Sequence, residues 1–380
     1  MRILVLSNIP PYRIGGAEVQ ARQLAECFHR RGHKVAIAGY AVPSGRIGVP
    51  ECSDGVIDTI HLPTLRGTRL SRALSFFLSL AGFLILRSRH YDLIYCRMIG
   101  ESAIVATILK QLKLLRLPLV ASSEGRGAVG DAAFLRSLPA RALIVRWINR
   151  QCQAINVLSP EIGMELRSLG LDAGIFSFIP NGVRISDGRP IGSPDRERCG
   201  LFVGRLVPVK GVAELLRAVR ILKDRGIAAR VKIVGEGPMG DVLRHFSIAL
   251  GIDTLITFHG MIPPEKVSDF YQKSAYLILP SYSEGFPLVV AEAMSFGLPV
   301  IVTRSGGPEH FVDERAGFVC PAGDPQALAD AMVMMLRMSP FELAQMGEHA
   351  RQRIRRGYDI EQVSDRLLSL FERLLLDINT

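Results

Sequence analysis

Short apolar runs alternate with longer amphipathic stretches along nearly the whole chain. The runs at residues 3–6 and 35–38 are brief and almost wholly apolar, which is typical of strands buried on both faces of a parallel sheet. The stretch between them, residues 17–31, repeats apolar residues at helical spacing and stops at Gly32. This pattern predicts an α/β fold. Further strands are expected at 92–96, 118–122, 154–158, 176–179, 201–203, 231–234, 256–258, 275–279 and 300–302, and helices at 102–115, 136–150, 241–250 and 264–274.

A break in composition divides this alternation into two domains. Residues 186–197 (SDGRPIGSPDRE) are rich in Gly, Pro and charge and are interpreted as a linker. The chain has 380 residues, enough for two domains of ordinary size. We predict two Rossmann-like parallel-sheet domains, at 1–185 and 198–357, facing across a cleft at the carboxyl ends of their strands. Residues 41–72 are expected to be mostly loop, and 358–380 form an amphipathic tail.

The charge of the chain is uneven. Residues 1–185 carry 23 Lys and Arg against 12 Asp and Glu, whereas residues 186–380 carry 23 against 24. A basic first half points to an anionic partner. The excess is mostly arginine spread along the sequence, without a basic stripe interleaved with aromatic residues. We therefore rank an anionic membrane surface or a phosphorylated acceptor above nucleic acid as the partner.

The segment ALSFFLSLAGFLIL at 73–86 is almost wholly apolar and lies between basic residues. Its 14 residues are fewer than the ~20 that span a bilayer. Two interpretations stay open. The segment is either a buried core helix of an α/β domain or a helix that lies in a membrane interface by its basic ends. The flanking arginines are Arg66, Arg69 and Arg72 before it and Arg87 and Arg89 after it.

Cysteine usage and the N-terminus indicate a cytoplasmic protein. The six cysteines are scattered without a Cys-x-x-Cys pair, which argues against a disulfide framework or a zinc site. The start MRILVLSNIP lacks the form of a signal peptide. No Asp-x-Asp occurs in the chain, so we expect no carboxylate-held metal.

The stretch 279–303 places two carboxylates around a strand, a helix start and a second strand. Glu284 follows a predicted strand, at the edge where open α/β sheets bind ligands. Pro287 suits the first turn of a helix, whose free backbone N–H groups at Leu288 and Val289 form an anion site. Glu292 lies within this helix. A plain strand–helix crossover with two solvated glutamates has the same spacing, and that interpretation stays open.

Two further loops carry candidate chemistry. Arg205 and Lys210 follow the first strand of the second domain and suit a diphosphate, as a fork donor and a point charge. Gly15 and Gly16 stand at a strand-to-helix turn, where backbone can approach a ligand, although a turn without a ligand fits equally well. The turn lacks the G-x-G-x-x-G spacing, so a dinucleotide is not indicated.

Six short motifs follow one another along the chain: GGAEV at 15–19, PNGV at 180–183, VGRLVPVKG at 203–211, GEGP at 235–238, HG at 259–260 and SEGFPLVVAEAMSFGLPVIVT at 283–303. In this order they resemble the retaining nucleotide-sugar glycosyltransferases of family 4 (glycosyl transferases group 1), which have the GT-B fold. The resemblance covers essentially the whole chain. It also implies that the amphipathic tail is the family's last helix, which crosses back onto the first domain.

The resemblance implies roles for the matched residues. Arg205 and Lys210 would bind the donor diphosphate, and Glu284 would contact hydroxyls of the donor sugar. Glu292 would take the ribose hydroxyls. The remaining donor contacts implied are Gly285, Phe286 and Pro287, which shape the loop, the N–H groups of Leu288 and Val289, which meet the phosphate, Gly235 and Gly260-Met261, which flank the base, and Gly15 and Gly16, which lie under the diphosphate or at the acceptor entrance.

One position departs from the family pattern. Many members have His-Gly at the strand end where this chain has Glu124-Gly125. In the family that histidine lies close to the reacting sugar. Glu124 therefore either replaces it as a polar contact or marks a different acceptor.

The resemblance implies a retaining, metal-independent hexosyltransferase without a cofactor. It would move a sugar from a nucleoside-diphosphate sugar to a hydroxyl of a polysaccharide or lipid-linked glycan, as in cell-envelope polysaccharide synthesis. We expect it in the cytoplasm or at the inner face of the membrane. Two alternatives stay open: a nucleotide-sugar 2-epimerase of the same architecture, and a non-catalytic nucleotide-sugar-binding protein.

Overall fold

The chain folds into two units. The computed structural model describes residues 1–10, 15–49, 55–65, 67–127, 130–186 and 196–379. The first unit contains Met1–Gly182 together with Ile360–Thr380, and the second contains Val183–Asp359. Most of the proposed linker, residues 187–195, lies outside the described residues.

The first unit is built on an eight-stranded sheet in the order β3-β4-β2-β1-β5-β6-β7-β8. Its strands are β1 (Arg2–Leu6), β2 (Lys34–Gly39), β3 (Gly45–Gly48), β4 (Val56–His61), β5 (Leu93–Cys96), β6 (Leu119–Ser123), β7 (Ala154–Val157) and β8 (Phe176–Phe178). All neighbours pair in parallel except β3, which pairs antiparallel with β4. We had predicted a parallel sheet, and the antiparallel edge strand β3 makes this one mixed.

Two of these strands lie where we predicted mostly loop. In β4, exposed and buried residues alternate along most of the strand: Val56 and Asp58 are exposed, whereas Ile57 and Thr59 are buried. This alternation of burial marks a half-exposed strand, and its sequence VIDTIH lacks the continuous apolar run on which the prediction relied.

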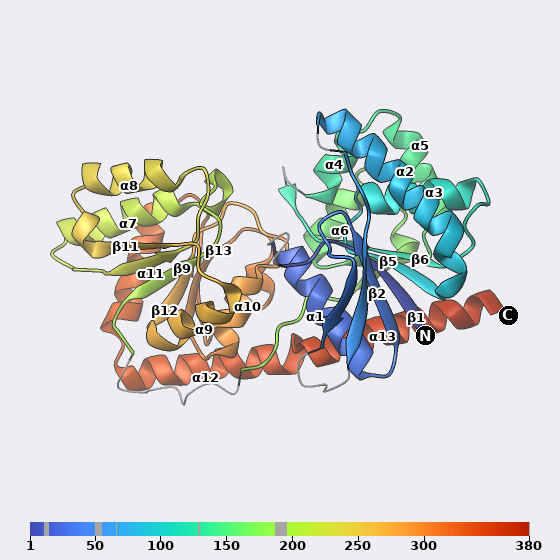
Figure 1. Ribbon diagram of the computed structural model, residues 1–380. Helices are drawn as coiled ribbons and strands as arrows, with labels where there is room; N and C mark the ends of the chain where they lie inside the picture. Colours follow the sequence, from blue (N-terminus) through green and yellow to red (C-terminus); the bar gives the residue numbers. More distant parts are fainter. Residues whose placement is uncertain (11–14, 50–54, 66, 128–129, 187–195, 380) are drawn as a thin grey trace. The chain divides into compact units, whose positions relative to one another are not determined.

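Besides the C-terminal helix, six α-helices accompany this sheet among the described residues: α1 (Gly16–Arg30), α2 (Arg69–Arg87), α3 (Glu101–Gln111), α4 (Asp131–Ser137), α5 (Arg141–Gln151) and α6 (Pro160–Arg167). Figure 1 shows α2, α3 and α5 grouped on one side of the sheet. The helix predicted at 136–150 is two helices, α4 and α5, because Pro139 disfavours helical backbone in the residue before it. Ser159 caps α6, and its side chain accepts a hydrogen bond from the Ile162 N–H.

The last helix, α13 (Ile360–Asn379), packs on the first unit, as predicted. It lies against α1, where Phe371 meets Phe28 edge to face at 5.8 Å between ring centroids. Val363 and Leu367 are buried in the same core. Arg30, the last residue of α1, and Arg31, which follows it, both pair with Glu361. The predicted crossing-back helix is thus confirmed, and an apolar stripe holds it in place.

The second unit is built on a six-stranded, all-parallel sheet in the order β11-β10-β9-β12-β13-β14. Its strands are β9 (Gly200–Val203), β10 (Val231–Val234), β11 (Ile256–Gly260), β12 (Tyr276–Leu279), β13 (Val300–Thr303) and β14 (Gly317–Cys320). Its helices are α7 (Val212–Asp224), α8 (Gly240–Ala249), α9 (Pro264–Lys273), α10 (Leu288–Ser295), α11 (Pro325–Arg337) and α12 (Pro340–Gly357).

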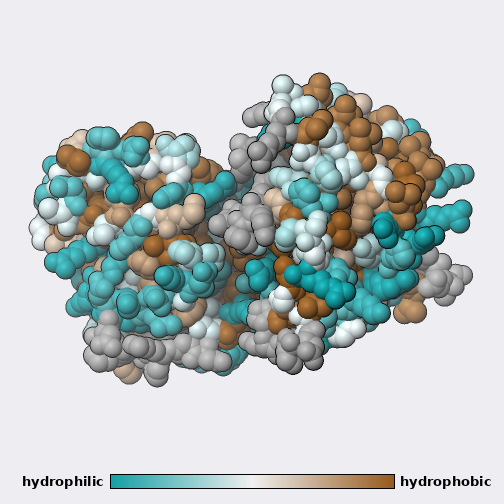
Figure 2. All heavy atoms as spheres, viewed as in Figure 1, coloured by the Kyte–Doolittle hydropathy of each residue, from teal (hydrophilic) through white to brown (hydrophobic). Residues whose placement is uncertain are grey.

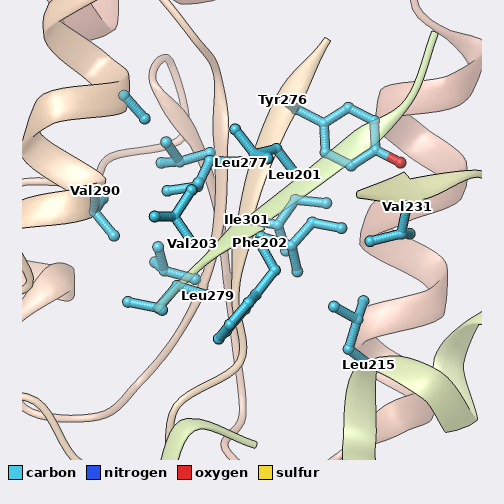
Figure 3. Close-up of a cluster of buried hydrophobic side chains, with 14 of the residues drawn as sticks. Leu201, Phe202, Val203, Leu215, Val231, Tyr276, Leu277, Leu279, Val290 and Ile301 are labelled. Carbon is cyan, nitrogen blue, oxygen red and sulfur yellow. The ribbon is translucent and has the colours of Figure 1, made fainter. Parts of the chain in front are cut away.

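The core of the second unit lies on both faces of this sheet. In Figure 3, Val290 of α10 and Leu215 of α7 lie on opposite sides of the central strands. The strand residues are buried throughout β9, β12, and β13. Burial on both faces explains why these strands read as continuous apolar runs and could be predicted closely.

Candidate functional site

The second unit has a reversal of strand order between β9 and β12. The chain runs outward from β9 to β10 and β11, then returns to place β12 on the other side of β9. The loops after β9 and β12 therefore leave the sheet side by side and turn to opposite faces. In open α/β sheets this point is where a crevice forms at the carboxyl ends of the strands.

Backbone contacts hold these two loops together. The Tyr282 N–H donates a hydrogen bond of 2.8 Å to the Val209 carbonyl. Gly211 has a left-handed backbone, with φ of 65°, and a Cβ there would overlap the carbonyl oxygen of Pro280. Only glycine meets both conditions without displacing the loop. The local sequence thus fixes the approach of one loop to the other.

This approach brings Lys210 and Glu284 into contact. The Lys210 Nζ lies 2.6 Å from the Glu284 Oε1, and the two side chains are only 19% and 10% exposed. The Glu284 N–H donates to the Ser305 carbonyl at 3.0 Å, which ties it to the loop after β13. Arg205 is exposed and has no ion pair among the described residues. The structure therefore gathers Lys210 and Glu284 into one pair and leaves Arg205 near them on the same loop.

The start of α10 presents free backbone donors next to this pair. Its N-cap is Pro287, which provides no capping side chain. Within the part of the chain that the structure describes, the N–H groups of Leu288 and Val289 have no hydrogen-bond acceptor. An uncapped helix start favours an anion. The loop before it is fixed by Phe286, which stacks on Phe311 at 5.0 Å between ring centroids.

Gly285 packs closely against the loop after β13. A Cβ at Gly307 would press on the Gly285 carbonyl oxygen, 2.4 Å away in the ideal geometry, so the backbones touch here. This contact and the hydrogen bond from Glu284 to Ser305 join the loop after β12 to the loop after β13. The loops after β9, β12 and β13 are thus held together.

Glu292 lies one turn inside α10, partly buried, and accepts a hydrogen bond of 3.0 Å from the Tyr271 hydroxyl. Burial raises the pKa of the Glu292 carboxyl above its ordinary value, and the bond from Tyr271 opposes part of that rise. Tyr271 belongs to α9, so the carboxyl is oriented from a second helix.

The predicted base-flanking residues lie at the ends of β10 and β11. The Gly235 N–H donates to the Gly260 carbonyl at 2.8 Å, and a Cβ at Gly235 would overlap the Gly204 carbonyl oxygen. The Met261 side chain is exposed, while its N–H donates to Glu236 at 3.2 Å. These loops lie at the same edge of the sheet as the loop after β9, on the side of β10 and β11.

Glu124 lies in the first unit, inside a buried polar cluster. Its carboxylate pairs with Arg97 at 2.6 Å, with the two side chains 6% and 1% exposed. The Ser122 hydroxyl and the Asn181 amide donate to its two oxygens at 2.8 and 3.0 Å. Asp131 accepts the Glu124 backbone N–H and fixes the loop. Both carboxylate oxygens of Glu124 are therefore occupied within the protein.

A cavity of about 350 Å³ opens at the corresponding edge of the first sheet. It lies at the ends of β1, β2 and β5, where the strand order reverses between β1 and β5. Gly15 and Gly16 stand beside it, as the N-cap and first residue of α1, whose next residues line the cavity. The polar and aromatic lining includes Asn8, Glu18, Tyr40, Phe76, Arg97 and Glu101.

Two family models match consecutive parts of the chain. The model described as "Glycosyl transferase 4-like domain" matches residues 15–182, and the one described as "Glycosyl transferases group 1" matches 184–353. Together they leave unmatched only residues 1–14, 183 and 354–380. The chain belongs to the group 1 glycosyltransferases.

Individual relatives extend this family assignment. The chain is 35% identical over 213 residues to a D-inositol 3-phosphate glycosyltransferase of Corynebacterium urealyticum, a match that covers 53% of this chain and 50% of that protein. The chain spans about half the length of this and similar curated relatives.

Solved structures confirm the predicted GT-B fold of the glycosyltransferase. Sucrose-phosphate synthase from Thermosynechococcus elongatus is similar with a TM-score of 0.80 at 24% identity over 99% of both chains. Anabaena HepE in complex with UDP-glucose is similar with a TM-score of 0.76 at 19% identity, over 98% of this chain and all of that one.

Sequence reasoning missed Arg97 and Tyr271. Arg97 follows β5 directly, so the rule that ligands lie at strand ends could have singled it out. Tyr271 follows no such rule, because it is a buried residue of α9 that reaches Glu292 only in the folded glycosyltransferase. Asn181 was noted within PNGV, but its partner Glu124 is 57 residues away and could not be inferred.

Proposed function

We propose that this glycosyltransferase moves a sugar from a nucleoside-diphosphate sugar to a hydroxyl of a polysaccharide or lipid-linked glycan, with retention of configuration and without a metal ion. The observation that carries the proposal is the pairing of Lys210 with Glu284 beside the uncapped start of α10, at the strand-order reversal of the second unit. A cation, an anion site and a hydrogen-bond acceptor lie there together, as a sugar diphosphate requires.

In this proposal the diphosphate binds Lys210, Arg205 and the N–H groups of Leu288 and Val289. Glu284 takes hydroxyls of the transferred sugar and Glu292 those of the ribose. The base lies along the loops at Gly235 and Met261. A neighbour of the same fold is known in complex with UDP-glucose, which supports a nucleotide sugar as the donor.

The reaction breaks the bond between the anomeric carbon and the terminal phosphate oxygen. The acceptor oxygen forms its bond to the same carbon from the same face, and its proton passes to the departing phosphate oxygen. No side chain is then required as a base. Charge builds on the leaving diphosphate, where Lys210, Arg205 and the α10 dipole each contribute about 1–4 kcal/mol of stabilisation.

The cavity of the first unit is the proposed acceptor site. Its lining combines the ring faces of Tyr40 and Phe76, which meet edge to face at 5.8 Å between centroids, with the polar groups of Asn8 and Glu101. Aromatic surface with a few polar groups suits a sugar ring. A lipid-linked glycan would bring the enzyme to the inner face of the membrane as a peripheral protein.

A donor screen tests the proposal. The purified protein is incubated with UDP-, GDP- and ADP-sugars, and release of free nucleoside diphosphate is followed with and without membrane extract and chelator. We expect one donor to be consumed, faster with extract and equally fast with EDTA. Isomerisation of the donor without release would favour the epimerase, and binding without any turnover would favour a non-catalytic protein.

Donor affinity is expected to weaken on acidification through Glu292. Ribose hydroxyls donate to its carboxylate, so protonation removes the acceptor. Because burial raises the pKa of Glu292, the loss begins above the usual range for glutamate, and affinity falls by up to about tenfold per pH unit below that pKa.

Calorimetric titration with the nucleoside diphosphate, from about pH 8 to about pH 5, measures this fall in affinity. Glu292→Gln keeps an amide oxygen but does not titrate, so its affinity should be weaker and should fall less on acidification. The fall that remains belongs to the terminal phosphate of the ligand, which gains a proton near about pH 6. If the affinity of Glu292→Gln falls on acidification as much as that of the wild type, another group is responsible.

A further inference from the structure

Helix α2 uses only one of its faces in the core of the first unit. Phe76, Leu80 and Leu84 are buried, and Phe76 also lines the cavity. Thr68 caps the helix, accepting the Ser71 N–H at 3.2 Å. The helix is longer than the apolar segment that we predicted, and residues Leu70–His90 are long and apolar enough to cross a membrane by length and composition alone.

The opposite face of α2 is a stripe of exposed leucines. Leu70, Leu74 and Leu78 follow one another at four-residue spacing, so they stack along one side of the helix. Leu78 is 62% exposed. The stripe continues to Ile85 and Leu86 at the far end. Large aliphatic side chains gathered in this way mark an interaction surface, unlike single exposed ones.

The apolar surface extends onto two neighbouring helices. Helix α3 packs against both α2 and α5. Beyond the end of α3, Leu112 and Leu114 are exposed, and Leu143 is exposed on α5. Figure 2 shows hydrophobic atoms gathered over this side of the first unit, with hydrophilic atoms at its margin.

The charges on this surface have one sign. Neither α2 nor α5 contains an Asp or Glu, and α3 contains one, Glu101, at its cavity end. The exposed cations on these helices and the turns that follow them are Arg72, Arg87, Arg89, Lys113, Arg116, Arg141, Arg146 and Arg150. The surface therefore combines an apolar stripe with a positive surround.

We propose that this α2–α3–α5 surface docks on an anionic lipid bilayer, with α2 lying in the interface and not spanning it. Leucines enter the acyl boundary while arginines meet anionic headgroups. Spanning is disfavoured because Leu80 and Leu84 on the other face belong to the core. A second copy of the chain is disfavoured because pairing two such surfaces would bring like charges together.

Docking deepens the proposed function, on which this step rests. Phe76 faces the cavity from the same helix whose outer side carries Leu74 and Leu78. A bilayer on the outer side of α2 would thus lie one helix diameter, about 10 Å, from the proposed acceptor site. A lipid-linked glycan could then enter the cavity while its lipid stays in the membrane.

Vesicle flotation tests docking without any sugar chemistry, so it can fail independently of the proposed function. The full chain is mixed with phosphatidylcholine vesicles with and without about a third phosphatidylglycerol. We expect binding to anionic vesicles only, reduced at high salt. Leu74→Glu with Leu78→Glu should lower partitioning at least about tenfold, and Arg72→Glu about fivefold.

Ile248→Glu is the matched control, because Ile248 is also 62% exposed but lies on α8 of the second unit. It should bind as the wild type does. Far-ultraviolet circular dichroism and the thermal unfolding transition report that the variants are folded. Equal binding of wild type and the double leucine variant would overturn the proposal. So would a dimer in sedimentation that the leucine variant dissociates, since a second copy would then cover the stripe.

Discussion

Lys210→Ala is expected to lower the turnover of nucleotide-sugar transfer by about 100-fold or more. The Lys210 amine reaches Glu284 at the start of α10. In the proposed reaction, the departing diphosphate gains charge there. A point charge aimed at that position stabilises the transition state more than the bound donor. The loss should therefore appear in kcat, with a smaller change in the KM for the donor. Steady-state kinetics with the donor identified by the screen measures both.

A second explanation must be separated from this one. Removing Lys210 also leaves the nearly buried Glu284 carboxylate without its partner, which could distort the loop. The double variant Lys210→Ala with Glu284→Gln distinguishes the two. If lysine serves the phosphate and glutamate the sugar, the double variant should be clearly worse than Lys210→Ala alone, although the effects of two residues in contact need not add fully. If the pair only holds the loop, the double variant should be no worse than Lys210→Ala alone.

Lys223→Ala serves as the control. Lys223 lies at the opposite end of α7 from the site and donates to the Gly251 carbonyl, so its loss changes surface charge without touching the donor. It should leave kcat unchanged. Turnover of Lys210→Ala within about threefold of the wild type would contradict the assigned role.

The strands of the second unit could be predicted closely because the physics there is local. A strand buried on both faces must be apolar throughout, and a loop that follows it must contain residues such as Gly211 that permit close approach. The same reasoning placed Lys210 and Glu284 on neighbouring loops. It could not show that they pair, since 74 residues separate them and only the strand order brings them together.

The first unit was predicted less well for a related reason. Strand β4 is half exposed, so its pattern differs from that of its buried neighbours. The apolar segment within α2 gave no indication of which face the core would cover. The structure buries Phe76, Leu80 and Leu84 and leaves Leu74 and Leu78 exposed. Sequence periodicity shows that a helix has faces, but the surrounding fold decides which face is buried.

The role of Glu124 is the second case in which a large effect is expected. Glu124 stands where many family members have a histidine, which suggested contact with the substrate. In the structure, both of its carboxylate oxygens instead contact Arg97, Ser122 and Asn181. Arg97→Met should lower the free energy of unfolding of the first unit by about 3–5 kcal/mol, because it leaves a buried carboxylate without a counter-charge.

Trp147 makes this measurement specific. It is the only tryptophan of the chain and lies on α5, so its fluorescence during urea unfolding reports the first unit. Arg2→Met is the control: Arg2 pairs with Asp92 at the surface of the same unit, and its loss should hardly shift the transition.

Replacing both partners should cost less than replacing either alone, because the cost of Arg97→Met comes mainly from the charge left behind. Arg97→Met with Glu124→Leu removes both charges and substitutes apolar side chains, so its unfolding transition should lie above that of Arg97→Met. If Glu124 instead contacts substrate, Glu124→Gln would abolish turnover while leaving the Trp147 transition in place. A fall in stability without a proportionate loss of turnover would establish Glu124 as the counter-charge that keeps Arg97 at the edge of the proposed acceptor cavity.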